Sequence, residues 1–564
     1  MKNVCSLLLA ILLLICISPA VSLFGQGFEI DGTTLVKYNG NASHVTIPNG
    51  VTSIGDRAFL DCWSLTSITI PSGVTSIGDN AFLRCTSLTS VSIPASVTSI
   101  GDIAFGRCTS LTSITIPSGV ASIGDRAFYG CSSLTSITIP AGVTSIGYGA
   151  FLECGDLSIT VDNQNNAYSS LDGVLFNKQQ TVLVRYPKKE RYYNIPESVV
   201  SIGDGAFSGS GLLTSITMPA GVTSIGNNAF SGCTRLTGIT MPASVTSIGD
   251  GAFSDCWRLT SITIPAGVIS IGDNVFYECH EITSITVDVQ NPAYSSLEGV
   301  LFNKDISALI KYPVSKRGSV YNIPESVTSI GDSAFYVCES LTSITIPAGV
   351  TFIGNNAFEW CKSLTSITLP AGLTFIGDSA FSNCDRLTSI TIPSGVTSIG
   401  DSAFSSCDRL TSITILAGVA SIGDSAFEWC SSLTSITIPA SVTSIGDRAF
   451  AYCLKLPDII VDTENPVYSS KGGILFNRQQ TVLIQYPNGK QESAYNIPES
   501  VTSIGDSAFE WCSSLTSVTI PTSVIFIGNG AFFQCNNLRT VTVSRETTIG
   551  RTAFPSRVGI IYSD

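Results

Sequence analysis

One pattern of apolar and polar positions recurs along almost the entire chain. In residues 65–85, LTSITIPSGVTSIGDNAFLRC, the apolar positions are Leu65, Ile68, Ile70, Val74, Ile77, Ala81, Phe82 and Cys85. Ile68 and Ile70 alternate with hydroxyl residues, which predicts a short β-strand with one buried face. Pro71 ends this strand because proline has no N–H group for a ladder. A second short apolar element follows the Ser-Gly turn, and a Gly-Asp pair opens a single predicted helical turn over residues 80–85.

The pattern returns with a period of 23 residues, and a phenylalanine marks each copy. The members of this column are Phe59, Phe82, Phe105, Phe128 and Phe151, then Phe207, Phe230, Phe253 and Phe276, then Phe335, Phe358, Phe381, Phe404, Phe427 and Phe450, and finally Phe509 and Phe532. A single copy cannot bury its own apolar side chains, so only a stack of copies is stable. The period therefore predicts a β-rich solenoid in which the phenylalanines lie over one another.

Three longer copies interrupt the regular series, at about residues 156–195, 282–323 and 456–497. Each contains two apolar runs, such as GVLFN and TVLVRYP in the first copy, on either side of a short polar turn. This arrangement predicts a β-hairpin. We interpret the three copies as enlarged coils that carry a flap, because each one returns to the regular pattern.

The two ends of the chain differ from the repeats. Residues 1–22 have the pattern of a secretory signal peptide, with Lys2, an apolar run over 7–17 and small residues before the expected cleavage point. Residues 23–47 are predicted to cap a continuous solenoid over 48–543, and residues 544–564 to cap its other end. No later apolar run is long enough to cross a bilayer. These features predict a secreted or cell-surface protein.

An acidic column follows the glycine of each copy and allows two interpretations. Its carboxylates include Asp56, Asp79, Asp102, Asp125, Asp250, Asp273, Asp378, Asp401, Asp424 and Asp447, and asparagine replaces them at Asn227, Asn355 and Asn529. The row could bind calcium, or each oxygen could accept backbone N–H groups at the start of a helical turn. The asparagines favour capping, because they keep the oxygen and lose the charge.

A cysteine column raises a similar question about redox state. Adjacent coils are expected to lie about 4.8 Å apart, which brings the Cα atoms of successive cysteines within the range of a disulfide. Parallel Cβ directions would nevertheless hold the sulfurs apart. We expect a row of buried thiols that act as small apolar residues, with disulfides between coils as the alternative.

Composition excludes several classes of function. The formal net charge is −13 and only 13% of residues are charged, without a basic stripe, which disfavours nucleic acid as a partner. The chain has two histidines, His44 and His280, too far apart in sequence for a catalytic triad or a histidine-rich zinc site. We therefore predict a protein that is not an enzyme and needs no cofactor or metal.

Two groups of residues are candidates for binding another protein. The flaps combine aromatic and basic side chains, and tryptophans stand directly before three cysteines, at a position whose side chain varies from copy to copy. The candidates are Tyr168, Arg185, Tyr186, Lys188, Lys311 and Tyr312 in the flaps, with Trp360, Trp429 and Trp511. Such residues are common in recognition surfaces. Alternatively, the tyrosines pack the hairpins, the lysines keep their edges soluble and the tryptophans cover the helical turns.

Three segments resemble the BspA-like, treponemal-type leucine-rich-repeat surface proteins. They are LTSITIPSGVTSIGDNAF with a cysteine three residues later, the opening DGTTLVKYNG and the longer variant NPAYSSLEGVLFNKD. The resemblance implies a right-handed solenoid with a parallel sheet on its concave side and a role in adhesion. Members of the family are reported to bind extracellular-matrix or clotting proteins.

The leading hypothesis is a secreted or cell-surface adhesin that binds host or neighbouring-cell proteins through its solenoid surface. The alternative is a structural or antigenic coat protein that acts as a spacer without a specific ligand.

Overall fold

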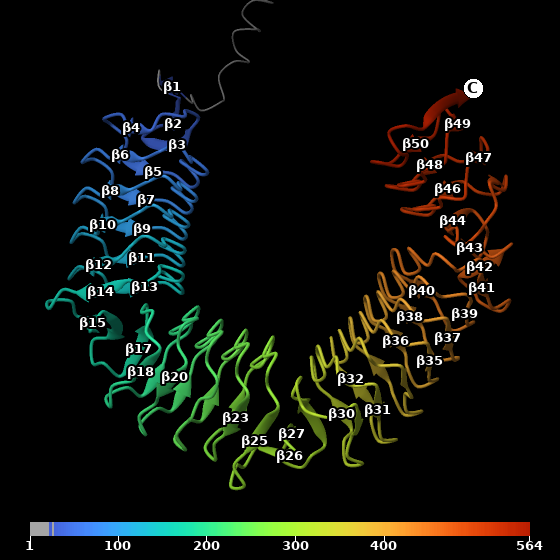
Figure 1. Cartoon of the computed structure of the whole chain (residues 1–564). Coiled ribbons are helices and arrows are strands. Elements are labelled where there is room, and N and C mark those ends of the chain that lie inside the picture. Colours follow the sequence, from blue (N-terminus) through green and yellow to red (C-terminus); the bar gives the residue numbers. More distant parts are fainter. Residues whose placement is uncertain (1–21, 25–26, 564) are drawn as a thin grey trace, which may run out of the picture. The chain divides into compact units, whose positions relative to one another are not determined.

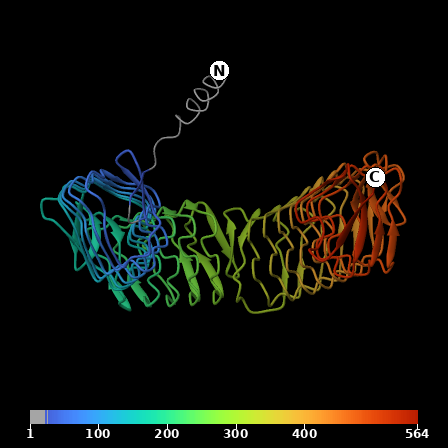
Figure 2. The ribbon, with the colours of Figure 1, turned by 90° about the horizontal axis from the view of Figure 1, so that it is seen from above.

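The computed structural model describes residues 22–24 and 27–563, so most of the predicted signal peptide lies outside the described residues. The chain forms two units, Met1–Leu259 with Gly267–Cys279, and Thr260–Ala266 with His280–Asp564. Within each unit, successive coils follow one another in chain order (Figure 1 and Figure 2). The described residues contain β-strands and turns but no helix.

The first unit contains long sheets built mainly of short parallel strands. The first strands of each long sheet pair antiparallel. An eight-stranded sheet has the order β1 (Ser22–Phe24), β2 (Phe28–Asp31), β3 (Thr34–Tyr38), β5 (Ser53–Ile54), β7 (Ser76–Ile77), β9 (Ser99–Ile100), β11 (Ser122–Ile123) and β13 (Ser145–Ile146). A seven-stranded sheet has the order β15 (Tyr168–Leu171), β16 (Val174–Asn177), β17 (Val182–Arg185), β19 (Ser201–Ile202), β21 (Ser224–Ile225), β22 (Ser247–Ile248) and β24 (Ser270–Ile271). The other face of these coils carries β4 (His44–Thr46), β6 (Ser67–Thr69), β8 (Ser90–Ser92) and β10 (Ser113–Thr115), the pair β12 (Ser136–Ile139) and β14 (Ser158–Val161), and the pair β18 (Tyr192–Asn194) and β20 (Ser215–Thr217).

The second unit repeats this plan. Its longer sheets are β26 (Tyr294–Leu297), β27 (Val300–Asn303), β28 (Ala308–Lys311), β30 (Ser329–Ile330), β32 (Phe352–Ile353), β34 (Phe375–Ile376), β36 (Ser398–Ile399), β38 (Ser421–Ile422) and β40 (Ser444–Ile445), and then β42 (Tyr468–Lys471), β43 (Ile474–Asn477), β44 (Val482–Gln485), β46 (Ser503–Ile504), β48 (Phe526–Ile527) and β50 (Thr548–Ile549). Its other face carries β23 (Ser261–Ile264) with β25 (Ser284–Val287), β29 (Val320–Asn322) with β31 (Ser343–Thr345) and β33 (Ser366–Ile367), β35 (Ser389–Ile392) with β37 (Ser412–Ile415), β39 (Ile436–Ile438) with β41 (Ile459–Val461), and β45 (Ala494–Asn496) with β47 (Ser517–Thr519), β49 (Thr540–Ser544) and β51 (Gly559–Ser563).

A regular coil has a strand on two of its sides. The alternation of apolar and polar residues along each strand determines which side chains are buried. In β6, Ile68 is buried between the more exposed Ser67 and Thr69. Ile68 pairs in parallel with Val91 of the next coil, 23 residues further along the chain. The predicted solenoid of parallel strands is thus confirmed.

The third side of the coil differs from the prediction of a helical turn, which was wrong. Residues 79–85 form tight turns in which Asn80 and Arg84 have positive φ angles of 57° and 60°. The backbone N–H groups of Asn80 and Phe82 donate to the carbonyls of Asp102 and Ala104 in the next coil, both at 2.7 Å. A helix would direct these groups along its own chain, so bonding between coils replaces the helix here.

The phenylalanine column forms stacks of rings, as the period predicts. Phe59 and Phe82 lie 5.0 Å apart between ring centroids with planes 8° apart, and Phe128 and Phe151 lie 5.7 Å apart at 3°. All four rings are at most 2% exposed. The stacked rings and the buried isoleucines beside them form the core of each coil.

The predicted hairpins are present and are built into the sheets rather than projecting as flaps. In the first hairpin, β15, β16 and β17 pair antiparallel, and β17 then pairs in parallel with β19 of the following coil. The ring of Tyr186, at the end of this hairpin, lies 5.0 Å from that of Phe207 with the planes tilted by 34°, and so starts a new series of rings. The β2–β3 hairpin begins the first series in the same way, through Tyr38 and Phe59.

The acidic column caps backbone groups, but across coils. Asp79 Oδ1 accepts the backbone N–H of Asp102 at 2.7 Å, and Asn227 Oδ1 accepts that of Asp250 at 2.8 Å. The described residues contain no cluster of three or more metal-ligating side chains. Each side-chain oxygen therefore fixes the start of the next coil's turn.

The cysteines of the repeat are present as thiols, and all except the half-buried Cys62 are buried. The Cys85 thiol donates to the carbonyl of Phe59 at 3.1 Å, and Cys108 donates to Phe82 at 3.2 Å. Burial raises the pKa of Cys108 to about 12. The column thus adds a third repeating interaction between successive coils.

Candidate functional site

The hairpin residues predicted to bind a partner lie mostly inside the molecule. Tyr186 and Tyr312 are 0% and 1% exposed, and Arg185 and Lys311 are each 8% exposed. The half-buried Tyr168 accepts the backbone N–H of Ile146 through its hydroxyl at 3.0 Å, which covers the edge of β13. These side chains build the hairpins, and Lys188 and its neighbours provide the accessible positions.

Arg185 and Lys311 occupy equivalent positions at the ends of β17 and β28. The Arg185 Nη1 group donates to the carbonyls of Gly205 and Ser208, each at 2.9 Å. Lys311 donates to the Ser333 carbonyl at 2.7 Å. Burial lowers the pKa of Arg185 to about 10. Backbone carbonyls of the following coil thus partly replace the water that each cation loses.

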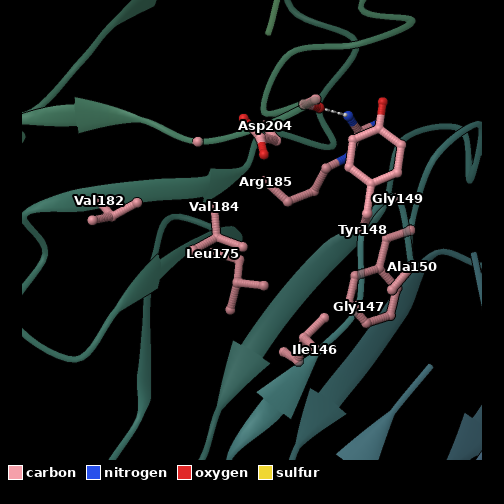
Figure 3. A pocket seen from close by; sticks show the side chains of 13 residues that line it. Ile146, Gly147, Tyr148, Gly149, Ala150, Leu175, Val182, Val184, Arg185 and Asp204 are labelled. Atoms are coloured by element: carbon pink, nitrogen blue, oxygen red, sulfur yellow. Dashed lines mark hydrogen bonds between the residues drawn. The ribbon is translucent and has the colours of Figure 1, made fainter. Parts of the chain in front are cut away.

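A cavity of about 250 Å³ lies where the first hairpin meets the coil before it (Figure 3). Tyr148 and Arg185 line it, together with apolar residues of β16 and β17. Tyr148 stands where most coils have aspartate, and a Cβ on Gly205 would come 3.1 Å from its ring. Gly205 has a φ of 60°, and Asn80 has a φ of 57° at the equivalent position, so the close approach of the Tyr148 ring is what favours glycine here.

The structure brings two of the three candidate tryptophans together. Trp429 stacks on Tyr452 at 4.1 Å with planes 4° apart, and the Tyr452 and Trp511 ring centroids lie 5.8 Å apart. Trp429 is 42% exposed, and Trp511 is half-buried. We call Trp429, Tyr452 and Trp511 the aromatic strip. Trp360 lies outside it and faces the Lys362 amine at 4.6 Å.

Charged side chains surround the aromatic strip. Arg448 forms ion pairs with Glu428 at 2.7 Å and with Glu510 at 3.0 Å, and its guanidinium lies 5.4 Å from the Tyr452 ring centroid. The Tyr452 hydroxyl donates to Glu510 at 2.8 Å. Glu510 is only 4% exposed, so these bonds fix the tyrosine in place.

Sequence reasoning did not identify Tyr452, Arg448 or Glu510. A signal was available for Tyr452, because it directly precedes Cys453 in the same position as the tryptophans. The contact between Arg448 and Glu510 joins residues on either side of the third hairpin, and no regular spacing indicates it.

An exposed pair of phenylalanines was also missed. Phe352 and Phe375 replace the serine that most coils place in their two-residue strand, and their rings stack at 5.2 Å. Phe352 is 39% exposed. The change from TSIG to TFIG in these two copies was the available signal.

Comparison with known families decides the classification. The BspA type leucine rich repeat region matches residues 34–158, 187–301, 319–431, 351–470 and 488–560. These segments cover most of the chain. The protein belongs to this family of leucine-rich-repeat proteins.

Several solved structures are similar to this BspA-type protein. A leucine-rich cell surface protein from Faecalibacterium prausnitzii is 32% identical, with 79% of this chain and 95% of that chain covered and a TM-score of 0.40. The pneumococcal vaccine antigen PcpA is 18% identical, with 95% and 93% covered and a TM-score of 0.41. A leucine-rich repeat protein from Bacteroides ovatus is 23% identical, with 96% and 97% covered and a TM-score of 0.24.

No curated protein matches the sequence. Within residues 22–24 and 27–563, no helix is long and apolar enough to cross a membrane.

Proposed function

We propose that this BspA-type protein is a secreted or cell-surface adhesin that binds another protein through the aromatic strip. The family assignment and the signal-like residues 1–22 support a place outside the cytoplasm. Tryptophan, tyrosine and arginine are the side chains most enriched at the energetic centres of protein interfaces. The aromatic strip with Arg448 has this composition.

The observation that carries the proposal is the contact of Trp429, Tyr452 and Trp511 at a partly exposed edge. Trp429 and Trp511 have φ angles of 61° and 58°, in the left-handed region. Other coils place Gly130 at the same position, but also Arg84 and Val337, with φ angles of 60° and 61°. A bulky residue costs about 1 kcal/mol more than glycine in this conformation. The left-handed turn is therefore common to the repeat, and the strip differs from it in bringing aromatic rings of three coils together where Trp429 is 42% exposed.

The rigid position of the strip also favours binding. Hydrogen bonds between coils hold the backbone on both sides, since Trp429 N–H donates to the Ala451 carbonyl at 3.0 Å and Trp511 N–H to that of Phe533 at 2.9 Å. Preorganised side chains lose little conformational entropy when a partner binds. The strip would therefore supply anchors without a folding step.

The test replaces Trp429 by asparagine, which occupies the equivalent position in another coil as Asn383. The asparagine loses the stack on Tyr452 and gains a more favourable backbone, so we expect a melting temperature within a few degrees of the parent protein. Saturable binding to a panel of immobilised extracellular-matrix and clotting proteins should weaken by about tenfold or more. Trp63→Ser, which removes a 64% exposed tryptophan elsewhere, is the matched control and should bind as the parent does.

Two outcomes would contradict the proposal. If Trp429→Asn lowers stability but leaves binding unchanged, the tryptophan acts as a structural cover. If the parent protein shows no saturable binding to any member of the panel, the spacer interpretation is favoured.

A further inference from the structure

A second cavity lies on the other side of Arg185, next to a run of small residues. Residues 208–211 are Ser-Gly-Ser-Gly, and Ser210 stands where most coils have cysteine. The cavity has a volume of about 540 Å³. It is bounded by the coil before the first hairpin, by the end of that hairpin and by the two coils that follow it. The small side chains leave this space open.

The cavity is lined by cationic groups from separate segments. Arg185, Lys189 and Arg235 line it, with Glu153 as the acidic member. The Lys189 amine lies 3.6 Å from the position of a Cβ on Gly155, which also lines the cavity. Lys188 lines the cavity too, although its amine lies near Gly173. This local excess of positive charge contrasts with the net charge of −13 of the whole chain.

Arg185 has no anionic partner of its own. Its side chain is 8% exposed, and no carboxylate in the described part of the chain forms an ion pair with it. Its Nε is buried without a hydrogen-bond partner among the described residues. A buried charge is costly unless it is paired. The carbonyls of Gly205, Ala206 and Ser208 that Nη1 contacts satisfy only part of the guanidinium.

We propose that this cavity binds a small tetrahedral oxyanion of the sulfate or phosphate class, either free or carried by a larger ligand. Arg185 would supply the buried positive charge, and Lys189 and Arg235 would neutralise the anion from the cavity's mouth. The cationic groups approach the cavity from three segments. A tetrahedral dianion can contact all of them, whereas a carboxylate is planar and carries one charge. This site is independent of the aromatic strip, which belongs to the second unit.

The third hairpin provides a substitution that fits the fold. Gln485 occupies the position equivalent to Arg185, and its Nε2 donates to the Tyr486 carbonyl at 3.1 Å. Arg185→Gln therefore removes the charge but retains a side chain that the fold accepts. Lys189→Gln with Arg235→Gln removes two exposed charges and leaves the buried side chains unchanged.

The experiment is calorimetric titration of the full chain with sodium sulfate and with sodium phosphate at constant ionic strength. We expect saturable binding of one equivalent. Arg185→Gln and the double variant should each weaken it by about tenfold or more, as expected for the loss of a charge-assisted hydrogen bond. Arg409→Gln is the control, because Arg409 is exposed at the same coil position as Arg235 in a regular coil. It should bind as the parent does.

Three results would overturn the inference: no saturable heat with either salt, equal binding by the parent and both variants, or equally tight binding of sodium acetate. A folded double variant that binds as the parent does would be decisive even if Arg185→Gln failed to fold.

Discussion

The carboxylate of Asp102 accepts the backbone N–H of Asp125 through Oδ1 at 2.7 Å, although the two residues are 23 positions apart in the chain. The bond joins equivalent residues of successive coils, and the same contact recurs between Asp79 and Asp102. Each coil thereby fixes the turn of its successor.

Asp102→Ala should lower the free energy of unfolding by about 1 kcal/mol, because the N–H of Asp125 loses its acceptor. Asp102→Asn keeps an acceptor oxygen and should be close to the parent, as Asn227 serves the same role for Asp250. Urea denaturation of both variants measures the difference. Equal stability of the alanine and asparagine variants would refute this role of the acidic column.

Gly124→Ala should destabilise the protein by about 1–3 kcal/mol. A Cβ at Gly124 would come 2.5 Å from Asp102 Oδ1 and 2.5 Å from the backbone carbon of Gly101. Gly73→Ala is a suitable control, since its Cβ would meet only the Val51 carbonyl at 3.5 Å. The melting temperatures of the two variants are compared with that of the parent. A loss in Gly124→Ala alone shows that the close approach of two coils is the cause, whereas equal losses show a general effect of alanine.

Phe105→Ala should cost about 3–5 kcal/mol, as large deletions in packed cores do. The Phe105 ring lies between Phe82 at 5.1 Å and Phe128 at 5.6 Å, and it is fully buried. Phe352→Ser restores the residue found in most coils at an exposed position and should leave stability within about 0.5 kcal/mol of the parent. Similar losses for the two variants would show that the stacked column is not the core.

Thiol labelling should separate Cys62 from the rest of the column. Interaction with the Cys85 side chain lowers the pKa of the half-buried Cys62, whereas burial raises the pKa of Cys108 to about 12. The thiolate is the reactive form, so iodoacetamide at pH 8 should modify Cys62 first. Mass spectrometry of native protein after short exposure gives the order of labelling. Cys108 labelled as fast as Cys62 would contradict it.

The same pKa shift predicts alkaline destabilisation. In the unfolded chain the thiol of Cys108 ionises near its ordinary value of 9.0, while in the folded chain it stays protonated until about pH 12. The folded state therefore binds more protons between these values, and its stability falls as the pH rises through this window. Unfolding at pH 8, 10 and 11 measures the trend; a stability that rises with pH would show the opposite linkage.

The sequence predicted the parts of the fold that one coil determines alone. Ile68 and Phe82 are buried, as the alternation of apolar and polar residues and the 23-residue period predict. The turn at Asn80 was predicted as a helix because local spacing does not show that its N–H bonds to Asp102 in the next coil.

The candidate site was predictable only in part, for a similar reason. Trp429 stands out in its column, but its contact with Tyr452 depends on the stacking of two coils. Arg185 lies in a basic, tyrosine-rich segment that is typical of a surface. It is buried against the following coil, where its guanidinium donates to the carbonyls of Gly205 and Ser208, and the segment itself does not indicate this contact.

The hairpins also bear on how such a gene can change length. Each hairpin begins a new series of rings with its own tyrosine, such as Tyr186 on Phe207 and Tyr486 on Phe509. Recombination between two equivalent hairpin segments would remove or duplicate a whole set of coils. At the new junction, a hairpin of the same type would still pack against the first coil of the next series. Genes of this kind can therefore vary in repeat number by in-frame exchange without exposing an uncapped core.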